Sequence, residues 1–242
     1  MEKNVHTGMN RTGMKASPID AKALLEVQEL QESAPAPSPT ADEIRAAYQA
    51  DADAVGTVPP PTSIKGVLGV AAEALTGHKM HILLDKMGER AAFERAGTRL
   101  YDAMLRKVSA AEHLPGGVTV AGLREIRDEE ASHFLLLADA IEKLGADPTT
   151  QTPCADIAAV QGMGLLQAMN DPRVTIPQAL QTLLDAELID AASWELLIEL
   201  ARQFKQNELV DRFTVALEAE NRHEATVKAW LSAAMAEVAS VG

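Results

Sequence analysis

The sequence predicts an all-α protein whose main part is an antiparallel four-helix bundle. Its composition is the first observation: alanine and leucine abound and aromatic residues make up only 3% of the 242 residues, a mixture that suits packed helices better than sheets. The second is a continuous helical periodicity of apolar residues from Thr62 onward. The third is an internal repeat, in which a helix with one inward glutamate precedes a helix with a Glu-x-x-His motif, twice over.

The sequence predicts that residues 1–61 form a polar N-terminal arm and that residues 62–242 form the bundle domain. The arm contains the low-complexity run SAPAPSPTADE and ends in three consecutive prolines, which favour an extended polyproline segment. Two short helical patterns lie inside it, at residues 19–32 and 41–54. We therefore expect extra N-terminal helices that do not belong to the core.

Two long helices are predicted in the first half of the bundle domain. A short apolar helix over residues 64–75 precedes a helix over residues 79–108, whose apolar stripe includes Glu94. The Pro-Gly-Gly turn at residues 115–117 then reverses the chain. The following helix starts near Thr119 and ends before Gly145, a C-cap pattern.

The second half repeats this pattern after a long connection. Residues 156–169 predict a crossover helix about 21 Å long, which is enough to cross most of the height of a bundle. Thr175 and Gln178 then form a capping-box pattern that opens a helix to about residue 206. The last helix covers residues 210–238. The inward stripe of the third long helix includes Glu187.

Six residues are candidate metal ligands. In each Glu-x-x-His pair the two side chains are neighbours on one helix face, so they can converge on one ion. The midpoint of Glu94 and Glu130 is residue 112, next to the first turn, and the midpoint of Glu187 and Glu220 falls within about one helical turn of the second reversal. The candidates should therefore meet at one level of the bundle: Glu94, Glu130, His133, Glu187, Glu220 and His223.

Four carboxylates and two imidazoles are ligands that suit Fe, Mn or Zn. Two divalent ions would neutralise the four carboxylates, with one histidine on each ion, Glu130 and Glu220 bridging, and Glu94 and Glu187 terminal. The alternative is a buried hydrogen-bonded network without metal. It is disfavoured because acceptors would outnumber donors.

On these motifs residues 79–238 resemble the ferritin-like di-iron carboxylate superfamily, which includes ferritins, bacterioferritins and rubrerythrins. The resemblance implies a ferritin-like four-helix bundle with one long crossover, two iron ions as the first choice of cofactor, and oxidoreductase chemistry of unassigned oxidase, oxygenase or peroxidase type. Relatives often carry an aromatic residue seven positions after the first glutamate. Tyr101 and Trp194 match that spacing here, and Tyr101 is expected to pack in the core or to support a ligand.

The chain departs from the superfamily pattern beside the Glu-x-x-His motifs. Many relatives place an aspartate just before each motif glutamate, where it accepts a hydrogen bond from a ligand histidine. Glu129 and Ala219 occupy these places here. One histidine must therefore find another acceptor, and Asp185 and Asp190 are candidates.

The formal net charge of −13 argues against nucleic acid or an anionic membrane as a partner and favours cations. The single Cys154 excludes an intrachain disulfide, and we expect a cytoplasmic protein because no secretory signal is recognisable. Expected partners are dioxygen or peroxide, an unknown small molecule, and further copies of the chain. The alternative functions are a ferroxidase that handles iron, and a bundle whose metal site is purely structural.

Overall fold

The computed structural model describes residues 18–33, 40–59, 63 and 80–240. The described residues divide into two compact units, one formed by residues 18–33 and 40–54 and the other by residues 55–59, 63 and 80–240. The short apolar helix expected at residues 64–75 lies outside the described residues.

The smaller unit contains two helices. Helix α1 covers Pro18–Ser33 and helix α2 covers Ala41–Asp51. Thr40 caps α2, because its side chain accepts from the backbone of Glu43 while the Glu43 side chain accepts from the backbone of Thr40. Helix α2 buries none of its residues. It ends at Asp51, three residues earlier than the sequence pattern indicated.

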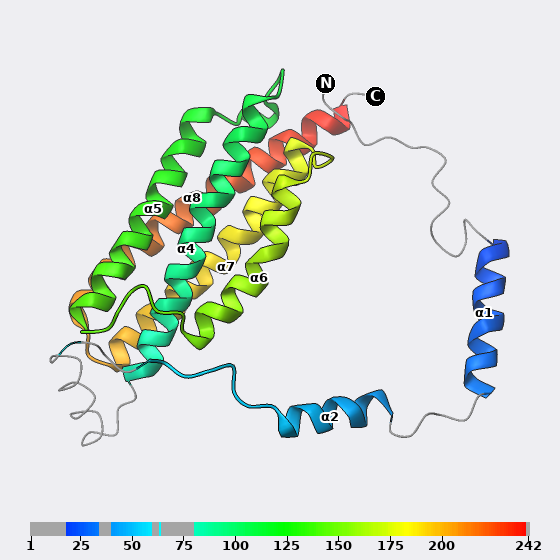
Figure 1. The fold of residues 1–242 in the computed structure, drawn as a ribbon. Coiled ribbons are helices and arrows are strands. Elements are labelled where there is room, and N and C mark those ends of the chain that lie inside the picture. Colours follow the sequence, from blue (N-terminus) through cyan, green and yellow to red (C-terminus); the bar gives the residue numbers. More distant parts are fainter. Residues whose placement is uncertain (1–17, 34–39, 60–62, 64–79, 241–242) are drawn as a thin grey trace. The chain divides into compact units, whose positions relative to one another are not determined.

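The larger unit is the four-helix bundle with one crossover helix, which confirms the predicted fold class (Figure 1). No strand occurs among the residues that the structure describes. The long helices are α4 (Met80–Ser109), α5 (Val120–Lys143), α7 (Ile176–Gln203) and α8 (Asn207–Ser240), and the crossover helix is α6 (Pro153–Asn170).

Local sequence signals determine where these helices begin and turn. Thr119, Thr152 and Thr175 cap α5, α6 and α7 by accepting a hydrogen bond from a backbone N–H in the first turn. The turn between α4 and α5 contains the short 3-10 helix η1 (Pro115–Gly117). Gly116 in η1 has φ 70°, and a Cβ there would lie 2.2 Å from the backbone oxygen of Trp230 on α8. Only glycine fits this contact.

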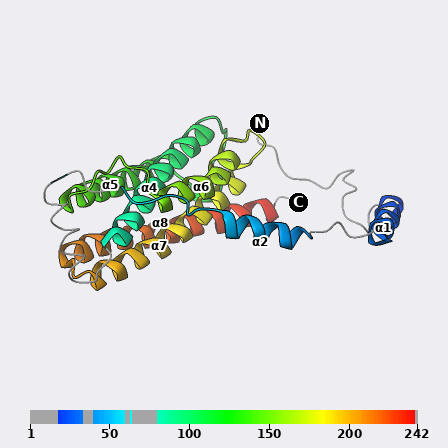
Figure 2. The ribbon, with the colours of Figure 1, turned by 60° about the horizontal axis from the view of Figure 1, so that its bottom comes forward.

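The crossover helix packs against α4 and α7 (Figure 2). At its start, the backbone N–H of Cys154 donates to the Asp85 carboxylate on α4, and the Thr152 hydroxyl donates to the Asp85 carbonyl. Gly88 leaves room for the Thr152 side chain, since a Cβ at Gly88 would lie 2.6 Å from its hydroxyl oxygen. These contacts fix the level of α6 along α4.

The apolar core is split into two clusters along the bundle. One cluster occupies the C-terminal half of α4, the N-terminal halves of α5 and α7, and the C-terminal half of α8. The other occupies the opposite halves of the same four helices and includes Trp194 and Phe213. A layer of buried polar side chains lies between them. None of the described helices is both long enough and apolar enough to span a bilayer.

Candidate metal centre

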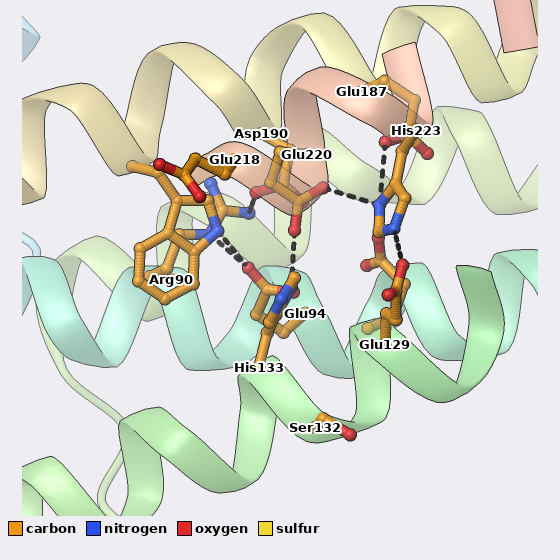
Figure 3. Close-up of polar contacts among 12 residues, drawn as sticks. Arg90, Glu94, Glu129, Ser132, His133, Glu187, Asp190, Glu218, Glu220 and His223 are labelled. Carbon is orange, nitrogen blue, oxygen red and sulfur yellow. Dashed lines mark hydrogen bonds and ion pairs between the residues drawn. The ribbon is translucent and has the colours of Figure 1, made fainter. Parts of the chain in front are cut away.

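All six candidate ligands lie in the polar layer between the two apolar clusters. Each of them is at least 93% buried, and α4, α5, α7 and α8 each contribute to the layer (Figure 3). The structure therefore brings together every residue that the sequence singled out as a ligand. Whether these residues bind metal stays a prediction.

One side of the cluster is formed by Glu94, His133 and Glu220. His133 Nδ1 lies 2.5 Å from Glu220 Oε1 and 3.7 Å from Glu94 Oε2. One ligand atom from each residue lies within 4.8 Å of the others. This spacing suits three ligands of one ion.

The other side is formed by His223 with Glu130, Glu187 and Glu220. His223 Nδ1 lies 3.0 Å from Glu220 Oε2, 3.5 Å from Glu130 Oε1 and 3.7 Å from Glu187 Oε2. These four residues also place one ligand atom each within 4.8 Å of the others. Glu220 belongs to both sides, and each of its two oxygens faces a different imidazole (Figure 3).

The aromatic residues at the seven-residue spacing hold the terminal carboxylates in a crossed arrangement. The Tyr101 hydroxyl donates to Glu187 Oε1, and the Trp194 indole N–H donates to Glu94 Oε1 over 2.9 Å. Each aromatic residue thus bonds the glutamate of the other helix. The reason is that α4 and α7 run antiparallel, with Glu94 opposite Trp194. Two turns forward from Glu94 on α4 is Tyr101, and two turns back from Trp194 on α7 is Glu187, so these two residues are also opposite each other.

Glu129 accepts a hydrogen bond from His223, with its Oε2 2.5 Å from His223 Nε2. Glu129 is therefore the acceptor for this histidine, and its Oε1 accepts from Arg222 Nη2 over 3.5 Å. Asp185 and Asp190, suggested as substitute acceptors, have other partners: Asp185 accepts from Gln181, and Asp190 lies beside Arg90. The His133 ring packs edge-on against Trp194.

Two residues of this layer, Arg90 and Gly97, were not predicted from the sequence. Arg90 is 2% exposed and places its Nε 3.1 Å from Glu94 Oε1 and its Nη2 3.4 Å from Asp190 Oδ1. Gly97 makes room for a ligand, because a Cβ there would lie 2.1 Å from Glu130 Oε2. The available signal was spacing: Arg90 precedes Glu94 by one turn, and Gly97 follows it by three residues.

Burial and mutual repulsion raise the pKa of several carboxyl groups in the layer. For Glu130, burial and the charges of Glu94 and Glu220 raise the pKa well above its usual range. Burial and the charge of Glu220 raise the pKa of Glu187 to about 8, against the opposing effects of His223 and Tyr101. The metal-free cluster therefore takes up protons at neutral pH.

The pKa values of His133 and His223 are raised, and the pKa of Glu220, which lies between them, is lowered. Burial lowers the pKa of both imidazoles, but the neighbouring glutamates, Glu220 foremost, outweigh it and raise each pKa to about 9. Burial raises the pKa of Glu220, yet hydrogen bonds with His133 and His223 bring it down to about 2. Without metal, the protonated rings of His133 and His223 thus supply the positive charge next to the ionised Glu220 carboxylate.

The donor set fits a metal centre better than a self-contained polar network. Two carboxylate oxygens of the cluster, Glu94 Oε2 and Glu187 Oε2, are buried without a hydrogen bond. Glu220 Oε1 and His133 Nδ1 lie 2.5 Å apart, but their contact is not a well-aligned hydrogen bond. Protein donors are thus too few for the carboxylate oxygens of the cluster. Divalent cations would satisfy these atoms and relieve the repulsion that raises the pKa values.

Comparison with known proteins agrees with this fold. Residues 120–235 match the model of the Ferritin family, described as a ferritin-like domain. A crystal structure described as ferritin-like, diiron-carboxylate proteins from Bacillus anthracis str. Ames matches with a TM-score of 0.50 and 20% sequence identity, over 64% of this chain and 98% of that chain. No curated protein matches. The chain therefore has a ferritin-like fold, as the sequence predicted.

Proposed function

We propose that the protein binds two metal ions, with iron preferred, in the buried cluster and uses them in redox chemistry with dioxygen or peroxide. The observation that carries the proposal is the position of Glu220, whose two oxygens face the two inward imidazole nitrogens. A carboxylate in that position can bridge two ions. Iron bound there would supply the electrons for reducing dioxygen or peroxide, which zinc cannot do.

The residues of the chain hold the ligands and keep water away. Tyr101 and Trp194 fix the two terminal carboxylates by one hydrogen bond each, leaving the second oxygen of each carboxylate for an ion. Glu129 accepts from His223 Nε2, which orients the ring so that Nδ1 faces inward. The apolar clusters on both sides of the layer exclude bulk water and so strengthen the electrostatic interactions inside.

The space around the cluster supports a small oxidant rather than a bulky organic substrate. A crevice beside Gly97, lined by apolar residues of α4, α6 and α7, has a volume of about 10 Å³. That is about the space of one water molecule. A cavity of about 410 Å³ opens where α4 and α6 end and α7 begins, and none of the six candidate ligands lines it.

The test is anaerobic loading with Fe(II), followed by addition of dioxygen or hydrogen peroxide. We expect about two Fe(II) per chain and rapid consumption of the oxidant, recorded with an oxygen electrode and by absorption spectroscopy. Failure to bind Fe(II) would refute the proposal. Bound iron that consumes neither oxidant would leave a structural site, and continued oxidation of excess Fe(II) into a mineral would indicate iron storage.

A further inference from the structure

Arg90 is a buried cation in the metal layer that the six-ligand pattern does not include. Its guanidinium lies between Glu94 of its own helix and Asp190 of α7 (Figure 3). Its Cζ lies 4.3 Å from the centre of the Phe93 ring. Burying a guanidinium is costly unless anions surround it. Here the anions are carboxylates of the metal layer itself.

Those carboxylates form a cation site of their own. Glu94, Glu130, Asp190 and Glu220 each place one oxygen within 4.8 Å of the others, and all four are buried. This group contains no histidine and differs from the two histidine-containing groups by Asp190, which is 2% exposed. The polar layer thus contains a third set of convergent ligand atoms.

The contact between Arg90 and these carboxylates depends on charge more than on fitted hydrogen bonds. Arg90 Nε, Arg90 Nη2 and Asp190 Oδ1 are all buried, and none makes a well-formed hydrogen bond. An arginine that matched its site would engage a carboxylate with two parallel hydrogen bonds. The four oxygens instead surround a position that a spherical cation could also occupy.

We propose that the Arg90 guanidinium fills a third cation position, formed by Glu94, Glu130, Asp190 and Glu220, and thereby limits the centre to two metal ions. This inference rests on the proposed dinuclear centre. It also balances charge: the five buried carboxylates of the layer carry five negative charges, and two divalent ions with Arg90 carry five positive charges. Removing the guanidinium leaves one negative charge uncompensated and opens its position to a third ion.

The test is equilibrium dialysis of the full chain against Mn(II), with bound metal counted by elemental analysis. We expect about two Mn(II) per chain in the wild type and about three in Arg90→Met, since methionine keeps much of the side-chain volume without the charge. The double variant Arg90→Met with Asp190→Asn removes both the cation and its aspartate, and should return to about two. All three proteins share the same acidic surface, so nonspecific binding cancels in the comparison.

Each outcome decides the matter. Two ions in Arg90→Met, or three in the wild type, would overturn the inference while leaving the dinuclear centre intact, whereas no bound ion in the wild type would remove the dinuclear centre itself. If Arg90→Met folds only when Mn(II) is present during expression, and then holds three ions per chain, the metal has replaced the guanidinium. If it stays unfolded with Mn(II) while the double variant folds, a metal cannot take that place and the inference fails.

Discussion

The Glu220 carboxylate connects the two sides of the cluster. Its oxygens face His133 on one side and His223 on the other, and it is completely buried. The other candidate glutamates each face one histidine. Loss of the Glu220 charge should therefore affect both metal positions, whereas loss of Glu94 or Glu187 should affect one.

Substituting Glu220→Gln should lower the metal content from about two ions per chain to less than one. The amide has nearly the same shape but no charge, and it cannot bridge two cations. Loss of a residue that only supports a ligand typically costs about 10- to 100-fold in metal affinity, and we expect loss of the Glu220 charge to cost at least as much. The measurement is Fe(II) content after anaerobic loading and gel filtration.

Glu218→Gln is the matched control, because Glu218 lies on the same helix but is exposed. It should bind metal like the wild type. Equal metal content in the two variants would show that Glu220 is not a bridging ligand.

The positions of the six candidate ligands in one layer could be predicted from the sequence, whereas the residues that contact them could be predicted only in part. The Glu-x-x-His spacing and the symmetric positions about each turn are properties of a helical sequence, so they identified all six residues. Arg90 was missed because an arginine on a helix normally lies in solvent. Its burial depends on Asp190, which comes from a helix 100 residues further along the chain.

The antiparallel helices α4 and α7 supply the crossed hydrogen bonds, and α4 also leaves space at Gly97 for the Glu130 carboxylate of α5. The helices and their order followed from periodicity and capping residues. The exact ends of the helices did not follow from these signals. Helix α6 begins at Pro153, three residues before the predicted start, because Thr152 caps the helix and proline is well tolerated in its first turn. The sequence did not predict that Tyr101 and Trp194 each bond the glutamate of the other helix. That pairing depends on the relative height of α4 and α7, which is known only from the packed bundle.

Gly97→Ala should disturb the centre through the packing of α4 against α5. The added methyl group would lie 2.1 Å from Glu130 Oε2, so the carboxylate has to move. We expect a clear loss of affinity for at least one of the two ions, measured by competition with a metallochromic chelator, while circular dichroism stays helical.

Gly164→Ala provides the comparison on α6, since a Cβ at Gly164 meets nothing within 4 Å. That change should leave metal binding unaltered and stabilise the helix by up to about 1 kcal/mol. Indistinguishable metal affinities for the two alanine variants would mean that Gly97 does not position Glu130.

For the whole molecule, the polar layer makes the metal-free protein sensitive to pH. The pKa of His133 and of His223 rises from 6.5 to about 9 on folding, so their stabilising contribution is complete below pH 6.5 and is lost as the pH rises towards 9. The pKa of Glu187 rises from 4.5 to about 8, so its burial costs stability progressively between these pH values. Both effects weaken the folded state at alkaline pH.

The Tm of the metal-free protein should therefore fall between pH 6.5 and pH 9, by about 5 °C or more. Below pH 4.5 stability should also fall, because the pKa of Glu220 is lowered to about 2 on folding and its contribution is lost on protonation. Saturating Mn(II) should reverse the alkaline trend, since ions replace protons at the same ligands. Differential scanning calorimetry checks this, and a metal-free Tm that rises from pH 6.5 to pH 9 would contradict it.

Anomalous X-ray scattering from crystals loaded with Fe(II) or Mn(II) would show whether two ions lie together in the layer formed by α4, α5, α7 and α8. We expect two peaks per chain, about 3.5–4 Å apart, on either side of the Glu220 carboxylate and next to His133 and His223. No peak in the layer, or peaks only on the acidic surface, would contradict it.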